Sequence, residues 1–75
     1  MIIALKRIYG PEDDYLALRK DFFENLELNG IGVCHEWDIP LRDASKKYPD
    51  VTVSINVVTR YEDYTACYRD GRLLH

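Results

Sequence analysis

The sequence predicts one small α+β domain in which two helices cover one face of a mainly antiparallel sheet of four or five strands. The chain has 75 residues, enough for a single domain over residues 1–75 with one core layer. Hydrophobic residues make up 47% and charged residues 31%, as in folded globular proteins. Apolar residues recur at the period of a strand in some segments and of a helix in others, in the order β-α-β-α-β-β(-β).

The first part of the chain predicts a strand followed by a long helix. Residues 2–9 are rich in Ile and Leu and end at Gly10-Pro11, which predicts a buried strand that stops at a breaker. Pro11 suits a first helical turn, and the next three carboxylates complement a helix N-terminus. The helix is predicted over residues 11–28, before Asn29-Gly30. Residues at helical spacing form its expected buried face: Tyr15, Leu16, Leu18, Phe22, Phe23 and Leu26.

The middle of the chain predicts a second strand and a short helix. Residues 31–37 have the pattern of a strand, with Trp37 at its end. Asp38 is expected to cap a short helix that begins near Pro40. The inner face of this helix is predicted from its spacing to be Leu41, Ala44 and Tyr48.

The last part of the chain predicts antiparallel strands. Residues 51–61 alternate between an apolar side and a polar side that carries Thr52, Ser54, Asn56 and Arg60, so one face is buried and one is wet. Residues 64–69 return as a strand, and Asp70-Gly71 predicts a two-residue turn into a short edge strand, 72–74. A core this small supports helices on one sheet face only, which leaves the polar face open.

Charge and cysteine content limit the kinds of partner and the cellular compartment that we expect for this protein. The net charge of −3 argues against a partner bound chiefly through phosphates, so nucleic acid is not the expected partner. Cys34 and Cys67 indicate reduced thiols in a cytoplasmic protein, with a bridge between them as the alternative. The apolar residues 1–5 are interrupted by Lys6-Arg7, so we expect no signal peptide and no membrane association.

Cys34 and His35 are the only adjacent soft ligands. A metal site needs two more ligands, and only Cys67 and His75 remain. Neighbours on a strand point to opposite faces, so Cys34 and His35 cannot act together as nucleophile and base. We therefore expect no cofactor, no metal and no catalytic activity. A small enzyme or enzyme subunit that uses Cys34 or His35 is the alternative.

Carboxylates and tyrosines provide candidate surfaces. The carboxylates of the first helix form either a solvated face or a surface for a basic partner. Tyrosine is enriched at protein–protein hot spots, stacks on nucleic-acid bases, and also fills half-buried positions. The candidate partner-binding residues come from the first helix, the open sheet face and the last hairpin: Glu24, Glu27, Asn56, Arg60, Tyr61, Tyr64 and Tyr68.

Four features between Val33 and Leu73 occur together. They are Trp37 followed closely by Pro40, a short helix that ends in Lys-Lys-Tyr-Pro-Asp at 46–50, the strand beginning at 51–53, and the Asp70-Gly71 hairpin. In these features the segment resembles the YubB-like ferredoxin-like domain of small phage- and plasmid-encoded proteins. The resemblance implies a split β-α-β arrangement and an origin in a mobile element, and it supplies no catalytic residues.

We therefore expect a non-enzymatic protein-binding module in the bacterial host cytoplasm. By analogy with small acidic phage proteins, it would dock on a host protein, for example as an inhibitor of bacterial defence such as an anti-CRISPR, or it would self-associate. A nucleic-acid-binding module that uses the open sheet face is a further alternative.

Overall fold

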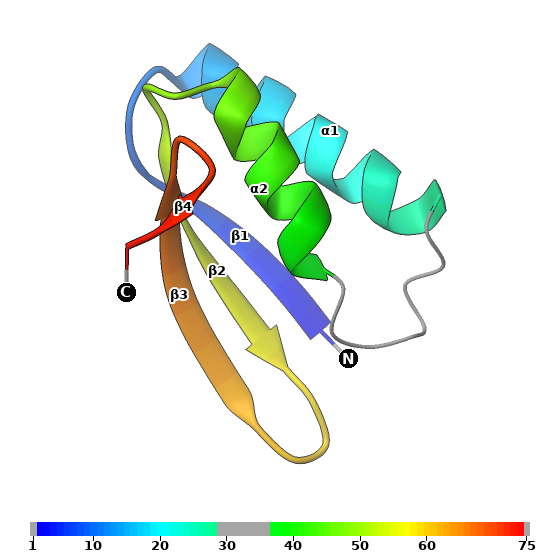
Figure 1. Ribbon diagram of the computed structural model, residues 1–75. Coiled ribbons are helices and arrows are strands. Elements are labelled where there is room, and N and C mark those ends of the chain that lie inside the picture. The colour runs from blue at the N-terminus through cyan, green and yellow to red at the C-terminus, as the bar shows by residue number, and fades with distance from the viewer. Residues whose placement is uncertain (1, 29–36, 75) are drawn as a thin grey trace.

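A computed structural model describes residues 2–28 and 37–74. In these residues two helices lie on one side of a four-stranded antiparallel sheet (Figure 1). The elements follow the order β1 (Ile2–Tyr9), α1 (Glu12–Leu28), α2 (Asp38–Lys47), β2 (Thr52–Val58), β3 (Asp63–Arg69) and β4 (Arg72–Leu73). The strands are neighbours in the order β1-β2-β3-β4, which confirms the predicted α+β class.

The strand predicted over residues 31–37 lies outside the described residues apart from Trp37. Trp37 has helical backbone angles, φ −63° and ψ −23°, and occupies the N-cap position of α2. The expectation that Trp37 ends a strand is therefore wrong, as is the expectation that Asp38 caps the helix. Asp38 belongs to the first turn of α2, where its carboxylate accepts hydrogen bonds from Arg42 and Tyr68.

Helix α1 begins one residue after Pro11, whose carbonyl accepts the Tyr15 N–H at 3.0 Å. Leu18, Phe22 and Leu26 are buried as predicted, and Tyr15 and Phe23 pack partly buried against the core. The expectation for Leu16 is wrong, because this residue is 53% exposed. Each residue advances about 100° around a helix axis, so Leu16 lies roughly 160° away from Leu18, on the solvent side.

Strand β2 is the centre of the core. Val53, Ile55 and Val57 are buried, and they alternate with half-buried residues on the face away from the helices. Leu41 and Ala44 of α2 complete the predicted inner face of that helix, with Tyr48 partly buried beside them. The alternation along β2 therefore gives one face covered by helices and one open face, as predicted.

Strand β1 was expected to be buried, and this is wrong for one of its faces. Ile3 and Leu5 pack against the core, whereas Ile2 and Ile8 are exposed on the open face. The helices cover only one side of the sheet, so half of an apolar strand stays in contact with water. The predicted Asp70-Gly71 turn is confirmed, because both residues have positive φ, 52° and 72°, as a two-residue type I′ turn requires.

Candidate functional site

The loop that joins β2 to β3 presents two of the predicted binding residues together. β2 ends at Val58, so Arg60 and Tyr61 lie in the loop and not in the strand where they were predicted. Tyr61 is 90% exposed and Arg60 is also exposed. In Figure 1 this end of the hairpin projects beyond both helices. The loop therefore carries an aromatic ring and a cation where a partner can reach both.

Thr59 holds the backbone of this loop. Its N–H donates to the carbonyl of Glu62 at 2.8 Å, which closes the turn. Its hydroxyl oxygen accepts the N–H groups of Tyr61 at 3.2 Å and Glu62 at 3.1 Å. Side-chain bonds of this kind are the means by which threonine stabilises turns. Tyr61 is thus displayed on an ordered turn.

Asn56 fixes the base of the same hairpin on the open sheet face. Its side-chain Nδ2 lies 2.6 Å from Asp63 Oδ1, 3.0 Å from Thr65 Oγ1 and 3.2 Å from the Tyr64 carbonyl. The amide has two N–H hydrogens for these three acceptors, so at least one hydrogen is shared. Asn56 therefore links β2 to the start of β3, and its side-chain N–H groups are already used in hydrogen bonds within the hairpin.

Tyr64 and Tyr68 point to the helix-covered side of the sheet, opposite Asn56. The ring of Tyr64 packs on Trp37 with centroids 5.8 Å apart and is 38% exposed. Tyr68 meets the same indole edge-on at 6.2 Å and is only 2% exposed. The expectation that Tyr68 contacts a partner is therefore corrected: its side chain belongs to the core.

A polar cluster joins β3 to α2 around Tyr68. The Tyr68 hydroxyl donates to one oxygen of Asp38, and Arg42 Nε donates to the other at 2.9 Å. The Arg42 guanidinium also lies 5.3 Å from the centre of the Tyr68 ring and donates to the Gly71 carbonyl at 3.1 Å. The cluster ties α2, β3 and the β3–β4 turn together and has the geometry of a structural cross-link.

Burial sets the protonation state of Tyr68. Removal of the phenol from water raises its pKa well above the usual value near 10, and the hydrogen bond to the Asp38 carboxylate raises it further. The separate hydrogen bond that Arg42 donates to Asp38 raises the pKa of Arg42. Tyr68 therefore stays neutral at physiological pH and acts as a hydrogen-bond donor.

The predicted acidic surface lies on a different layer from the hairpin. Glu24 is an exposed residue of α1, and Glu27 belongs to the last turn of the same helix. The structure thus divides the predicted partner-binding residues into a helix group and a sheet group. In the sheet group, Arg60 and Tyr61 share the hairpin loop, and Asn56 lies at the base of the hairpin, bonded to the Tyr64 carbonyl.

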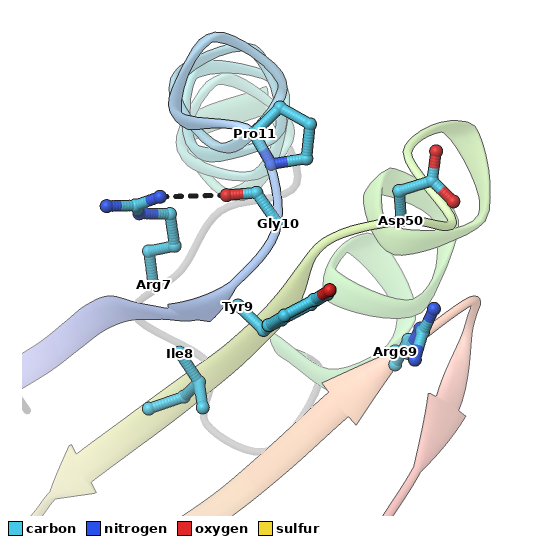
Figure 2. A pocket seen from close by; sticks show the side chains of 7 residues that line it. All are labelled: Arg7, Ile8, Tyr9, Gly10, Pro11, Asp50 and Arg69. Atoms are coloured by element: carbon cyan, nitrogen blue, oxygen red, sulfur yellow. Dashed lines mark hydrogen bonds between the residues drawn. The ribbon is translucent and has the colours of Figure 1, made fainter.

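A shallow pocket of about 670 Å³ lies at the other end of the sheet, where β1 turns into α1. Seven residues from β1, the turn, the α2–β2 connection and β3 line it (Figure 2): Arg7, Ile8, Tyr9, Gly10, Pro11, Asp50 and Arg69. None of these residues is among the binding residues predicted from the sequence. The turn Asp70-Gly71 was a usable signal, because a two-residue hairpin places Arg69 directly opposite Arg72. The position of Tyr9 in the same pocket as Arg69 could not be found from sequence, since it depends on the registers of β1 on β2 and of β2 on β3.

The structure does not place the cysteine and histidine residues considered in the sequence analysis in a functional site. Cys34 and His35 lie outside the described residues, and Cys67 is a half-buried free thiol on β3. Within residues 2–28 and 37–74, no three His, Cys, Asp or Glu side chains gather as metal ligands would. Neither described helix has the length and apolar composition to cross a membrane.

Comparison of the chain with protein-family models, curated proteins and solved structures finds no match. The resemblance to the YubB-like domain therefore stays a prediction.

Proposed function

We propose that this protein is a non-enzymatic protein-binding module that docks on its partner through the β2–β3 hairpin. The observation that supports it is Tyr61, which is 90% exposed on a turn fixed by Thr59. Water contact with a tyrosine ring is unfavourable, and an aromatic side chain can bury about 150 Å² or more at an interface. At about 25 cal/mol per Å², that area corresponds to roughly 4 kcal/mol before the costs of association.

The ordered turn reduces one of those costs. A side chain on a flexible loop loses conformational freedom when it binds, whereas this backbone is already held by three hydrogen bonds of Thr59. Arg60 stands next to Tyr61, and arginine and tyrosine are among the residue types enriched at hot spots. The loop therefore offers an anchor of the right chemistry whose backbone has little entropy left to lose.

The hairpin tip is too small to be the whole interface. A standard protein interface covers about 800 Å² per partner, which is roughly one sixth of the 5071 Å² surface of the described residues. The contact would therefore extend from Tyr61 along the open sheet face, over the Asn56–Asp63–Thr65 group at the hairpin base.

The resemblance to the YubB-like domain suggests what kind of partner this protein binds. It would make this a mobile-element protein whose partner is a host protein, with components of bacterial defence as one class, and with a second copy of the chain as the alternative. It also implies a ferredoxin-like arrangement. The antiparallel pairing of β1 with the strand that follows α2 is compatible with that arrangement.

Capture from a host lysate, followed by mass spectrometry and a measured Kd for the recovered protein, tests the proposal. We expect Tyr61→Ala to weaken binding at least about 30-fold, which is the effect of a 2 kcal/mol hot spot, with an unchanged melting temperature. Leu16→Ala removes another exposed apolar side chain, from α1, and serves as the matched control. Glu24→Lys tests the acidic helix in parallel.

Two results would contradict the hairpin assignment. One is full affinity of the Tyr61→Ala protein. The other is loss of binding in Glu24→Lys alone, which would move the interface to α1. A concentration-dependent dimer in light scattering that Tyr61→Ala dissolves would support the same surface with a second copy as the partner. A salt-sensitive complex with nucleic acid in place of a protein would refute protein binding.

A further inference from the structure

One row of residues crosses all four strands on the open face, at the end of the sheet opposite the β2–β3 loop. The register pairs Tyr9 with Thr52, Thr52 with Arg69, and Arg69 with Arg72. Paired residues in neighbouring strands project to the same face, so these four side chains lie side by side. Tyr9 is 67% exposed, and both arginines are exposed.

Arg69 and Arg72 form an unfavourable pair as they stand. Directly opposed residues in an antiparallel pair have Cβ atoms about 5 Å apart, and like charges in that position repel. The described residues contain two salt bridges, one made by Arg42 and one by Lys47, and neither involves these arginines. An anion placed between the two guanidinium groups would relieve the repulsion.

Arg69 is also held in position. Its Nε donates to the carbonyl of Pro49 at 3.2 Å, which uses one of its five N–H groups. The four others have no partner among residues 2–28 and 37–74. A guanidinium whose orientation is already fixed can receive a carboxylate through two parallel N–H bonds with less loss of freedom.

The pocket beside this row supplies apolar contact. Figure 2 shows the ring of Tyr9 extending from β1 toward Arg69, with Ile8 on the same strand, whereas Arg7 lies on the other side of Tyr9 and donates to the Gly10 carbonyl. A ligand bound at Arg69 would therefore meet the phenol group of Tyr9 next to the cation.

The charged residues near this pocket determine which kind of anion it can bind. Asp50 lines the pocket, and Asp70 lies in the turn between Arg69 and Arg72. With Arg7, which also lines the pocket, three guanidinium groups face these two carboxylates and leave one net positive charge. A single carboxylate neutralises that charge, whereas a doubly charged phosphate or a polyanion exceeds it. We infer that this pocket binds a carboxylate carried by an apolar or aromatic group, as in a small aromatic acid or at the C-terminus of a peptide. The inference does not depend on the proposed function, since the hairpin loop is at the opposite end of β2.

Nuclear magnetic resonance titration of the full chain tests this inference, with N-acetylphenylalanine as the probe and its neutral amide as the matched ligand. We expect the acid to shift the Nε–H signals of Arg69 and Arg72 and the backbone amides of Tyr9 and Thr52. The amide should bind at least 10-fold more weakly. A short peptide that ends in phenylalanine distinguishes the two sources, because tighter binding than the free acid indicates a peptide C-terminus and equal binding indicates a small acid.

Matched variants locate the site. Arg69→Gln and Arg72→Gln should each weaken the acid at least 10-fold, while Arg60→Gln, on the distant loop, should leave its affinity unchanged. Arg72→Gln should also not lower the melting temperature, because it removes a like-charge contact. Equal binding of acid and amide, or equal effects of all three variants, would overturn the inference. Tighter binding of inorganic phosphate or of a single-stranded oligonucleotide than of the acid would overturn it as well.

Discussion

Gly10 lies where β1 ends, and its replacement by alanine tests the packing that joins β1 to β2. Its φ is +107°, a backbone conformation that residues with a side chain rarely adopt. A Cβ at this position would lie 2.4 Å from the Asp50 carbonyl oxygen and 2.8 Å from the Val51 Cα. Both are backbone atoms, and the Val51 N–H is bonded to the Tyr48 carbonyl at 3.1 Å. No side-chain rotation can relieve the clash, so the chain itself must move.

The two contributions give the expected loss of stability for Gly10→Ala. The positive φ costs about 1–2 kcal/mol in a residue with a Cβ. Displacement of packed backbone costs about 1–3 kcal/mol more, by comparison with overpacked cores. The sum is about 2–5 kcal/mol. A chain of this length has a total stability of roughly 4–11 kcal/mol, so the variant should lose about a fifth of it or more.

Gly71→Ala is the matched control for this prediction. Gly71 also has a positive φ, +72°, but its added Cβ would meet only the side chain of Lys46, at 2.4 Å from Cγ. Lys46 is exposed and can change rotamer, so we expect a loss of about 1–2 kcal/mol from the backbone conformation alone. Urea unfolding followed by circular dichroism measures both variants. Equal losses in the two, or a loss below about 1 kcal/mol in Gly10→Ala, would refute the reasoning.

Three further predictions concern the hydrogen bonds that hold the sheet and helices. Tyr68→Phe keeps the buried ring and loses the bond to Asp38, so unfolding at pH 7 should show a loss of about 1–2 kcal/mol. The raised pKa of Tyr68 means that the unfolded chain releases this proton near pH 10 while the folded chain keeps it. Stability should therefore be full below pH 10 and fall as pH rises above it, and Tyr68→Phe should weaken that fall; parallel curves for the two proteins from pH 9 to 11 would contradict this. Ser45→Ala leaves the buried N–H of Gly71 without its acceptor at 3.1 Å, so we expect a loss of about 1–3 kcal/mol in the free energy of unfolding. Each kcal/mol should lower the melting temperature by about 4–8 °C. An unchanged melting temperature would show that water replaces the hydroxyl. Asn56→Ala removes an exposed hairpin contact and should cost only about 0.5–1 kcal/mol in urea unfolding, and a loss above 2 kcal/mol would show that the hairpin depends on it.

Features encoded by neighbours in sequence could be predicted from the sequence. The helical spacing of Leu18, Phe22 and Leu26 predicted the buried face of α1, and the alternation along β2 predicted its two faces. Asp70-Gly71 predicted its turn because few residue pairs adopt positive φ at both positions. In each case the local backbone geometry and the position of each side chain on its element follow from residues a few places apart.

The candidate site was predicted in part. Arg60 and Tyr61 were identified as surface residues because of their type, but they were placed in a strand that in fact ends at Val58. Tyr68 was expected at the surface with the other tyrosines of the hairpin. It is buried because Trp37, Asp38 and Arg42 on α2 cover it, and no property of its own neighbours in sequence reveals that cover.

For the elements that the structure describes, the sequence by itself determined the type of each element, most of the apolar face of each helix and the turn between β3 and β4, because periodicity and turn chemistry act over a few residues. Only the tertiary structure decided which residues meet across the sheet. Tyr9 and Arg69 are 60 positions apart, and both align with Thr52 because of the register of β1 on β2 and of β2 on β3. A shift of one residue in either register would send the alternate side chains to the open face. The register in turn depends on the packing of the helices over Val53, Ile55 and Val57, which is a property of the whole core.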